Sequence, residues 1–206
     1  MQPKDYWENV YSTKGTNAVS WFQEHADRSL RWIRAAAAAP DSSIIDVGGG
    51  ASTLVDDLLA DGFTNITVLD LSSAALAAAR QRLGARGGTP RWLEADITKT
   101  TLATHAYDVW HDRAVFHFLT SPADRAAYVS TVRRAVKPLA HVIVATFAED
   151  GPDKCSGLPV VRYTAASLHA EFGERFALLM HETEAHRTPF GTVQQFVYCC
   201  FRKLEP

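Results

Sequence analysis

The chain has 206 residues, of which 47% are hydrophobic and 21% charged, and its formal net charge is −2. This composition predicts one globular domain with a full hydrophobic core. No apolar run approaches the roughly 20 residues that cross a membrane, so we expect no membrane association. Basic and acidic residues are interspersed, which makes nucleic acid held through phosphate contacts an unfavoured partner.

Three cysteines, Cys155, Cys199 and Cys200, give neither a disulfide framework nor the spacing of zinc ligands. They indicate a reducing setting, and the chain start at Met1 to Tyr6 lacks the hydrophobic region of a signal peptide. We therefore expect a cytoplasmic protein without a metal site. Cys199 and Cys200 are adjacent on one expected strand and point to opposite faces, so at least one should be buried.

The first 40 residues have a helical pattern. Helices are expected over about 4–11 and about 26–38, and Pro40 ends the second one. We interpret residues 1–40 as an N-terminal helical cap and residues 41–206 as the core of a single domain that covers 1–206.

A β-branched strand over 43–47 runs directly into a glycine turn, Gly48-Gly49-Gly50, and a helix-like segment follows over 53–60. Strand, glycine turn and helix start predict a nucleotide-binding crossover, because glycine lets the backbone approach a ligand closely. Asp46 stands two positions before the first glycine. The dinucleotide fingerprint requires a third glycine where Thr53 stands, and the Gly-Lys-Ser/Thr ending of a phosphate loop is missing.

Further strands and helices alternate after this turn. Strands are expected at 65–70, 90–94, 106–110 and 141–147, and Ser72 and Ser121 should begin helices. Asp70 ends the second strand about 20 residues past the glycine turn, where an acid binds ribose hydroxyls. Asp96 and Asp108 occupy comparable places beside the third and fourth strands, although each acid alone could equally be a turn or cap residue.

The last third of the chain predicts two long strands, at 176–184 and 192–201. The linker 185–191 is too short for a crossover helix, so the pair should be antiparallel. A nicotinamide dehydrogenase would normally end its sheet with parallel strands, so this hairpin disfavours that class.

The acid-x-Gly-x-Gly turn, the acids after successive strands and the closing hairpin together resemble the class I S-adenosylmethionine (SAM) dependent methyltransferases. This resemblance implies an α/β, Rossmann-like fold with a seven-stranded, mostly parallel sheet of order 3-2-1-4-5-7-6 and an antiparallel C-terminal hairpin. It also implies SAM as cofactor and S-adenosylhomocysteine as product. The cofactor-binding residues that it implies are Asp46, Gly48, Gly49, Gly50, Asp70, Leu71, Asp96, Ile97, Trp21 and Tyr11.

Within this family the glycines would pass under the amino-acid part of SAM, and Asp46 would orient its ammonium. Asp96 would accept the adenine amino group, and the backbone amide of Ile97 would meet a ring nitrogen. A softer resemblance, to citrate synthase and elongation-factor lysine methyltransferases, rests on 6–11 (Tyr-Trp-Glu-Asn-Val-Tyr) and on Trp21-Phe22. It implies that Trp7, Tyr11 and Trp21 close over the sulfonium, although the aromatic residues could instead anchor the N-terminal helix.

Methyl transfer from a sulfonium is an in-line displacement that requires alignment and a deprotonated nucleophile. The acceptor should lie beyond the fourth strand, near His111, Asp112 and His117. As candidate catalytic residues, Asp112 could orient a lysine ammonium or take its proton, and His111 could act as a base. His111 could also be a strand-end histidine bonded to backbone, and His117 is expected to be structural. His-Asp-Arg-Ala replaces the Asn/Asp-Pro-Pro-Tyr/Phe motif of DNA and glutamine amino-methyltransferases, which sets that class aside.

We therefore expect a methyltransferase that acts on a protein lysine or a small-molecule nucleophile. Two alternatives remain open: a nicotinamide-dependent oxidoreductase, and a SAM-binding partner protein without activity. Methylation of a metalloid at Cys155 is disfavoured because Cys199 and Cys200 cannot both face it. The glycine- and proline-rich loop 151–159 is expected to form a shaped lid. Further candidates for the substrate rim are His186, Arg187, Gln194 and Gln195.

Overall fold

The computed structural model describes residues 4–13 and 15–204. Met1–Pro3, Lys14 and 205–206 lie outside the described residues, and so does the first half of the segment Met1 to Tyr6 in which we expected no signal peptide. No helix within the described part is long and apolar enough to span a bilayer. The division into a cap over 1–40 and a core over 41–206 stays a prediction.

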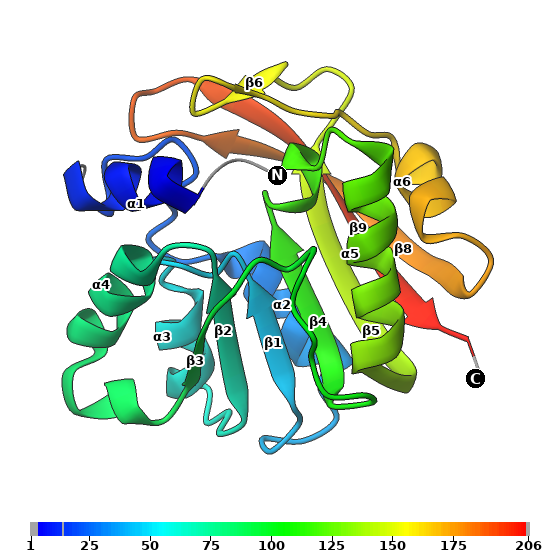
Figure 1. The fold of residues 1–206 in the computed structure, drawn as a ribbon, viewed down its shortest axis with the longest axis horizontal. Helices are drawn as coiled ribbons and strands as arrows, with labels where there is room; N and C mark the ends of the chain where they lie inside the picture. The colour runs from blue at the N-terminus through cyan, green and yellow to red at the C-terminus, as the bar shows by residue number, and fades with distance from the viewer. Residues whose placement is uncertain (1–3, 14, 205–206) are drawn as a thin grey trace.

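A seven-stranded mixed sheet, in the order β3-β2-β1-β4-β5-β9-β8, forms the centre of the molecule (Figure 1). Five strands run parallel, and β9 lies antiparallel between β5 and β8. Their bounds are β1 Ile44–Val47, β2 Ile66–Asp70, β3 Arg91–Glu94, β4 Tyr107–Arg113, β5 Val136–Phe147, β8 Phe176–Arg187 and β9 Val193–Lys203. The expected strand order and the closing antiparallel hairpin are confirmed.

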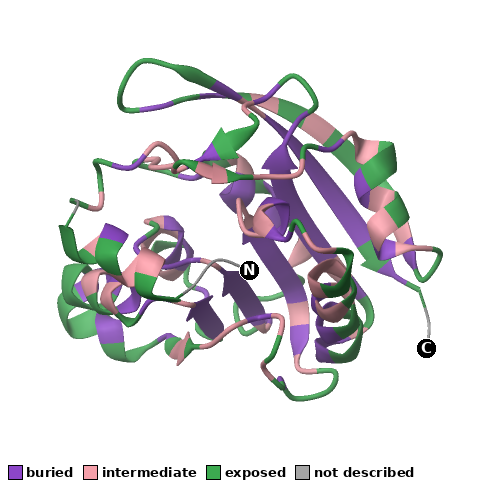
Figure 2. Cartoon of the chain, turned by 45° about the horizontal axis from the view of Figure 1, so that its top comes forward, coloured by how far each residue is buried: buried purple, intermediate pink, exposed green. Residues whose placement is uncertain are grey.

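Helices cover both faces of this sheet. Their bounds are α1 Lys4–Thr13, α2 Asp27–Ala36, α3 Leu54–Ala60, α4 Ser73–Leu83, α5 Pro122–Ala135 and α6 Ala165–Phe172, with short 3-10 turns η1 Gly84–Gly88 and η2 Phe116–Phe118. The cores of α5 and α6 pack on one face, and those of α2, α3 and α4 pack on the other. The inner strands of the sheet are mostly buried, whereas the edge strands β3 and β8 are largely half-buried or exposed (Figure 2).

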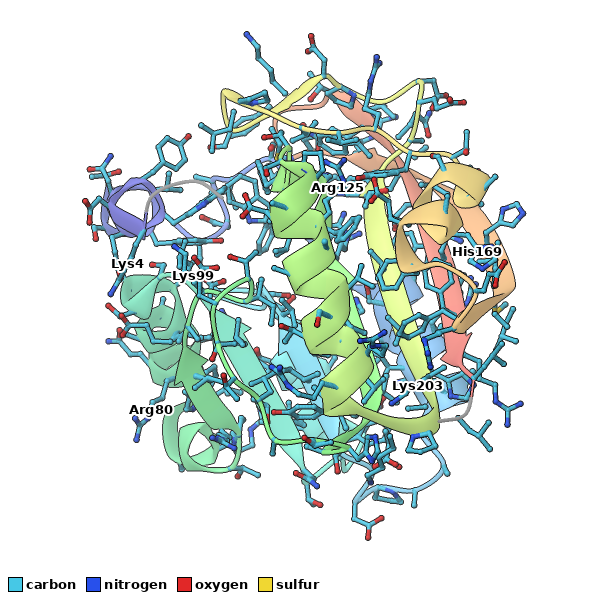
Figure 3. All side chains as sticks on the ribbon, turned by 45° about the vertical axis from the view of Figure 1, so that its right-hand side comes forward. Lys4, Arg80, Lys99, Arg125, His169 and Lys203 are labelled. Atoms are coloured by element: carbon cyan, nitrogen blue, oxygen red, sulfur yellow. The ribbon has the colours of Figure 1, made fainter. Side chains whose placement is uncertain are left out.

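Local sequence signals account for several element ends. The Ser72 hydroxyl accepts from the Ala75 amide at 3.1 Å, which confirms the expected start of α4, and Pro122 occupies the first turn of α5. Arg125 of α5 pairs with Glu171 of α6 at 2.7 Å and joins the two helices (Figure 3).

The two adjacent cysteines of β9 are both buried. Cys199 belongs to the core under α5 and α6, whereas Cys200 belongs to the core on the opposite face. The expected alternation of the strand is therefore confirmed, and each thiol behaves as a small hydrophobic group.

Strand β4 is longer than its sequence predicted. Pairing continues past Trp110, because β1 and β5 both extend alongside, with Asp46 opposite His111 and Val144 opposite Asp112. The candidate catalytic residues therefore lie within a strand and not beyond its end. A two-stranded hairpin, β6 Lys154–Cys155 and β7 Leu158–Pro159, forms in the expected lid loop and was not predicted as strands.

Candidate active site

Two adjoining cavities open at the carboxyl ends of β1, β2 and β4. Counted together with the solvent at their mouths, the larger has an empty volume of about 710 Å³ and the smaller one of about 570 Å³. Both are lined by Tyr11, Trp21, Gly48 and Arg113. The larger one is also lined by Trp7, Val47, Leu69, Asp70, Leu71, Ala95, Ile97, Ala114, Val115, Phe118, Leu119 and Cys155.

The glycine turn closes tightly around neighbouring side chains. Gly48 and Gly50 have positive φ angles of 70° and 38°. A Cβ on Gly48 would come within 2.0 Å of Val115 Cγ2, and one on Gly50 within 2.6 Å of Asp70 Oδ2. Gly49 is equally confined, because its Cβ would stand 2.5 Å from Asp46 Oδ2. A side chain at any of these positions would fill the cradle that the turn forms.

Asp70 ends β2 on the wall of the larger cavity and is only 8% exposed. Its Oδ1 accepts from the Ser72 amide at 2.8 Å. Burial raises the pKa of this carboxyl to about 7, and the nearby charges of Asp46 and Glu8 act in the same direction. An acid held in this way can accept two hydroxyl groups of a ribose once it is ionised.

The two residues expected to bind adenine, Asp96 and Ile97, do not both face the larger cavity. Ile97 lines the larger cavity, whereas Asp96 is not among the residues that line it. Asp96 Oδ1 accepts from the Thr98 amide at 2.9 Å, and its Oδ2 pairs with Lys99 at 3.2 Å. Burial acts to raise the Asp96 pKa, but these partners outweigh it and hold the pKa below its usual value.

Asp46, His111 and Ser29 form a buried chain beside the smaller cavity. Asp46 Oδ1 lies 2.7 Å from His111 Nδ1, and His111 Nε2 lies 2.8 Å from Ser29 Oγ. All three residues line the cavity, and none is more than 3% exposed. Since both ring nitrogens of His111 are engaged by side chains, the ring holds Asp46 in place and is bonded to side chains and not to backbone.

Asp112 faces the opposite side of β4. Its carboxylate accepts from the Val115 amide at 2.9 Å, the Phe116 amide at 3.1 Å and the Tyr128 hydroxyl at 2.6 Å. Asp112 is fully buried, lines neither of these two cavities, and burial raises its pKa to about 6. Side chains alternate along a strand, so His111 faces the cavities and Asp112 faces the α5 layer.

A model of the methyltransferase domain family matches residues 45–142 of this chain. The chain is 26% identical over 155 residues to "EEF1A lysine methyltransferase 2" of Danio rerio, covering 68% of this chain and 66% of that protein. The human protein of the same name is 24% identical over 200 residues, which cover 91% of this chain and 79% of the relative. A third relative, "eEF1A lysine and N-terminal methyltransferase" of Danio rerio, is matched over only 25% of its length.

Solved structures share the fold at low sequence identity. The N-methyltransferase NodS from Bradyrhizobium japonicum, in complex with S-adenosylhomocysteine, superposes with a TM-score of 0.74 over 98% of both chains at 15% identity. A structure described as converting a disulfide bond into a thioacetal group during echinomycin biosynthesis gives a TM-score of 0.79 at 18% identity and covers 98% of this chain and 92% of its own. With this fold, the match to the methyltransferase family model and the similarity to the two lysine methyltransferases place the chain among the class I SAM-dependent methyltransferases.

The residues of this methyltransferase fit SAM as cofactor. The structure brings Tyr11, Trp21, Gly48, Asp70, Leu71 and Ile97 to the larger cavity, and Asp46, Gly49 and His111 to the smaller one. The crowded glycine turn permits a ligand to approach the backbone closely, and Asp70 places a carboxyl group on the wall of the larger cavity. Gly50 lines neither cavity but leaves the space that Asp70 Oδ2 occupies.

Aromatic side chains roof the methyltransferase pocket. Trp7 packs edge-to-face on Trp21 at 5.8 Å and on Phe118 at 5.3 Å, and Tyr11 lies 6.4 Å from Trp21. The two interpretations of Trp7 and Trp21 are compatible, since both rings line the pocket and both anchor α1. Cys155 of β6 completes the lining; burial raises the pKa of its thiol to about 12.

Contacts between residues that are distant in sequence fix α1, and with it the aromatic roof, against the core. Glu8 of α1 accepts from the Ser73 amide at 2.6 Å and the Ala74 amide at 3.1 Å, at the start of α4. The Tyr6 hydroxyl bonds to the Ser156 carbonyl and lies 3.0 Å from the Ser156 hydroxyl. Lys4 pairs with Glu94 at the end of β3 (Figure 3). The start of α1 is thus fastened to three separate parts of the core.

Other candidates lie away from the two cavities. His117 is fully buried, its Nδ1 accepts from the Phe147 amide at 3.2 Å, and burial lowers its pKa to about 3, which fits the expected structural role. His186 and Arg187 line a separate open groove with Glu184. Gln194 and Gln195 line none of these three cavities.

Sequence reasoning missed Arg113, Glu8, Ser29 and Phe118. For Arg113 a signal existed, because it stands two positions after His111 and so shares its face of the strand. For Glu8 and Ser29 no local pattern singles out the residue, since their partners come from other elements.

Proposed function

We propose that this methyltransferase transfers the SAM methyl group to an uncharged amine nitrogen, with a protein lysine as the preferred acceptor. The observation that carries this proposal is the aromatic wall formed by Trp7, Trp21 and Phe118. An apolar wall favours the neutral amine over the ammonium, and aromatic faces attract the methylated cation that forms. The names of the relatives, which are lysine methyltransferases, support the same acceptor.

The acid–base groups that line the larger cavity also favour an amine. Asp70 lies where the ribose is expected, and Tyr11 and Cys155 have pKa values raised by burial. Among the described lining residues, none is thus a base near neutral pH at the methyl-transfer end. A hydroxyl acceptor would require such a base, whereas an amine can lose its proton to water before the reaction.

The proposed cofactor site uses the residues expected from the family. Gly48, Gly49 and Gly50 lie under the methionine part, and Asp46 binds its ammonium. Asp70 and Leu71 hold the ribose, Asp96 and Ile97 the adenine, and Tyr11 and Trp21 cover the sulfonium. His111 orients Asp46, and this role replaces the base expected from the sequence. Asp112 supports the turn that follows β4, and this role replaces the expected proton acceptor.

A small-molecule amine is the second candidate acceptor. The roof formed by α1 and the β6–β7 hairpin encloses the larger cavity, and an enclosed site suits a small substrate. The predicted cytoplasmic location fits either acceptor and stays a prediction.

Radiolabelled SAM distinguishes the candidates. The purified protein is incubated with an elongation factor of the eEF1A type, with a cell lysate, and with a panel of primary amines, thiols and alcohols. We expect label in a lysine side chain, and none with Asp70→Asn protein. Labelling of a free amine alone would select the small-molecule candidate, and labelling of alcohols or thiols alone would refute amine methylation.

A further inference from the structure

Arg113 occupies the junction of the two cavities. It is the last residue of β4 and faces the same side of the sheet as His111. It lines both cavities, and its side chain is only 10% exposed. It is the one arginine or lysine among the described residues that line either of them.

The guanidinium group of Arg113 is held rigidly. Its Nε donates to the Tyr198 hydroxyl at 2.9 Å, and its Nη1 donates to the Trp21 carbonyl at 3.1 Å. The Cζ atom lies 4.5 Å from the centre of the Phe196 ring, at a cation–π distance. These contacts fix the plane of the group before any ligand arrives.

The same group has unused hydrogen-bonding capacity. Buried Nη2 makes no hydrogen bond, and Glu184 Oε2 lies 3.5 Å from it. A buried donor without an acceptor is costly, and a charged one more so. The Arg113 side chain is therefore better matched to a pocket that contains an anion.

The surrounding ion pairs leave this cluster with excess positive charge. Glu184 is shared between Arg113 and Arg28, whose Nε lies 3.8 Å from it. Glu182 pairs with Arg28 and with Arg31. Three guanidinium groups thus share two carboxylates, and the cluster carries one positive charge in excess.

We propose that Arg113 binds a ligand carboxylate at the junction of the two cavities. A planar guanidinium suits a carboxylate because two N–H groups can meet two oxygens. The methionine end of SAM is the favoured source, since its ammonium is assigned to Asp46 on the same side of the sheet as Arg113. A carboxylate on the methyl acceptor is the other source. The proposal rests on the proposed SAM site.

Calorimetry with two adenosyl ligands tests the first source. S-adenosylhomocysteine carries the carboxylate, whereas decarboxylated SAM lacks only that group relative to SAM. We expect Arg113→Met to weaken S-adenosylhomocysteine binding by about 10- to 100-fold, as for a hydrogen bond to a charged group, and to leave decarboxylated SAM unaffected. Arg86→Met, at an exposed position outside the site, is the matched control and should change neither affinity.

A second arm tests the acceptor as the source. If Arg113→Met leaves S-adenosylhomocysteine affinity unchanged, the saturated complex is titrated with propionate and followed by NMR. Saturable shifts that vanish in Arg113→Met assign the carboxylate to the acceptor, and absence of such shifts overturns the proposal. Equal weakening of both adenosyl ligands also overturns it, because Arg113 would then act only through the fold. Failure of the wild-type protein to bind either adenosyl ligand would instead refute the SAM site itself.

Discussion

The ends of β1 and β2 and the end of β4 lie at one edge of the same sheet, yet they build their parts of the site differently. At β1 the site uses the glycine turn that follows the strand directly, and at β2 it uses Asp70, the last residue of the strand. At β4 the site depends on consecutive residues within the strand, because His111 lies on one face of the sheet and Asp112 on the other.

Two buried acids make this difference concrete. Burial raises the pKa of both, to about 7 for Asp70 and to about 6 for Asp112. Asp70 lines the larger cavity, whereas Asp112 is bonded to Tyr128 and to two backbone amides of the following turn. A raised pKa and a position near a strand end therefore do not identify a ligand-binding acid unless it is also known which way its side chain points.

The largest effect is expected at Asp70. Asp70→Asn should weaken SAM binding by at least about 100-fold, because two charge-assisted bonds to the ribose are lost. Calorimetry measures the change. Asp112→Asn is the matched control, since it alters an equally buried acid of the same sheet edge and should bind SAM normally. Loss of binding in both variants would erase the distinction between the two strand ends.

Asp112 should matter for stability. Asp112→Ala leaves the Tyr128 hydroxyl and two backbone amides without their acceptor, and should lower the free energy of unfolding by about 2–3 kcal/mol. Urea denaturation measures this value. Tyr128→Phe removes one partner of the same network and should cost about 1 kcal/mol. A fully stable Asp112→Ala protein that binds SAM but has no turnover would show that Asp112 is catalytic, as the sequence predicted, and not structural.

The pH dependence of cofactor binding should follow Asp70. Because burial raises the pKa of this acid to about 7, it is neutral below that pH and becomes an acceptor for both hydroxyls only above it. SAM affinity should therefore rise between pH 6 and pH 8, by up to about tenfold per unit below the pKa, and level off above it. Asp70→Asn should show no such rise. Equal wild-type affinity at pH 6 and pH 8 would contradict the assignment of ribose to Asp70.

The smallest effect is expected at Glu8, which fastens the roof beside the β2 end. Glu8→Gln removes a charge from the start of α4 and should weaken SAM binding by about 2- to 5-fold. Asp5→Asn removes the same charge from an exposed position of the same helix and should have no effect. Stopped-flow fluorescence of the roof tryptophans would show whether faster cofactor release accounts for the change; unchanged affinity and release would mean that α1 stays docked without Glu8.

The sequence was sufficient where structure follows from neighbouring residues. The strand, turn and helix around Gly48 predicted the crossover, and the short linker 185–191 predicted the antiparallel hairpin that β8 and β9 form. Asp46 and Asp70 were found because their position before or after the turn fixes where they lie.

The sequence was insufficient where the direction of a side chain depends on pairing between segments that are distant along the chain. Strand β4 continues through Arg113 because β1 and β5 flank it, and a shift of one residue reverses the face of each side chain. The orientation of Arg113 depends on Tyr198, 85 positions away, and that of Glu8 on Ser73, 65 positions away. No local pattern contains such contacts.

The contact between Tyr6 and Ser156 has a consequence for how the enzyme is made. It joins residues 150 positions apart, and the entropy of closing so long a loop must be overcome before the contact contributes stability. During synthesis the glycine turn and Asp70 leave the ribosome about a hundred residues before Ser156 does. The roof is therefore expected to assemble after the glycine turn and Asp70, and the junction at Arg113 later still, because Tyr198 and Phe196 leave the ribosome after Ser156.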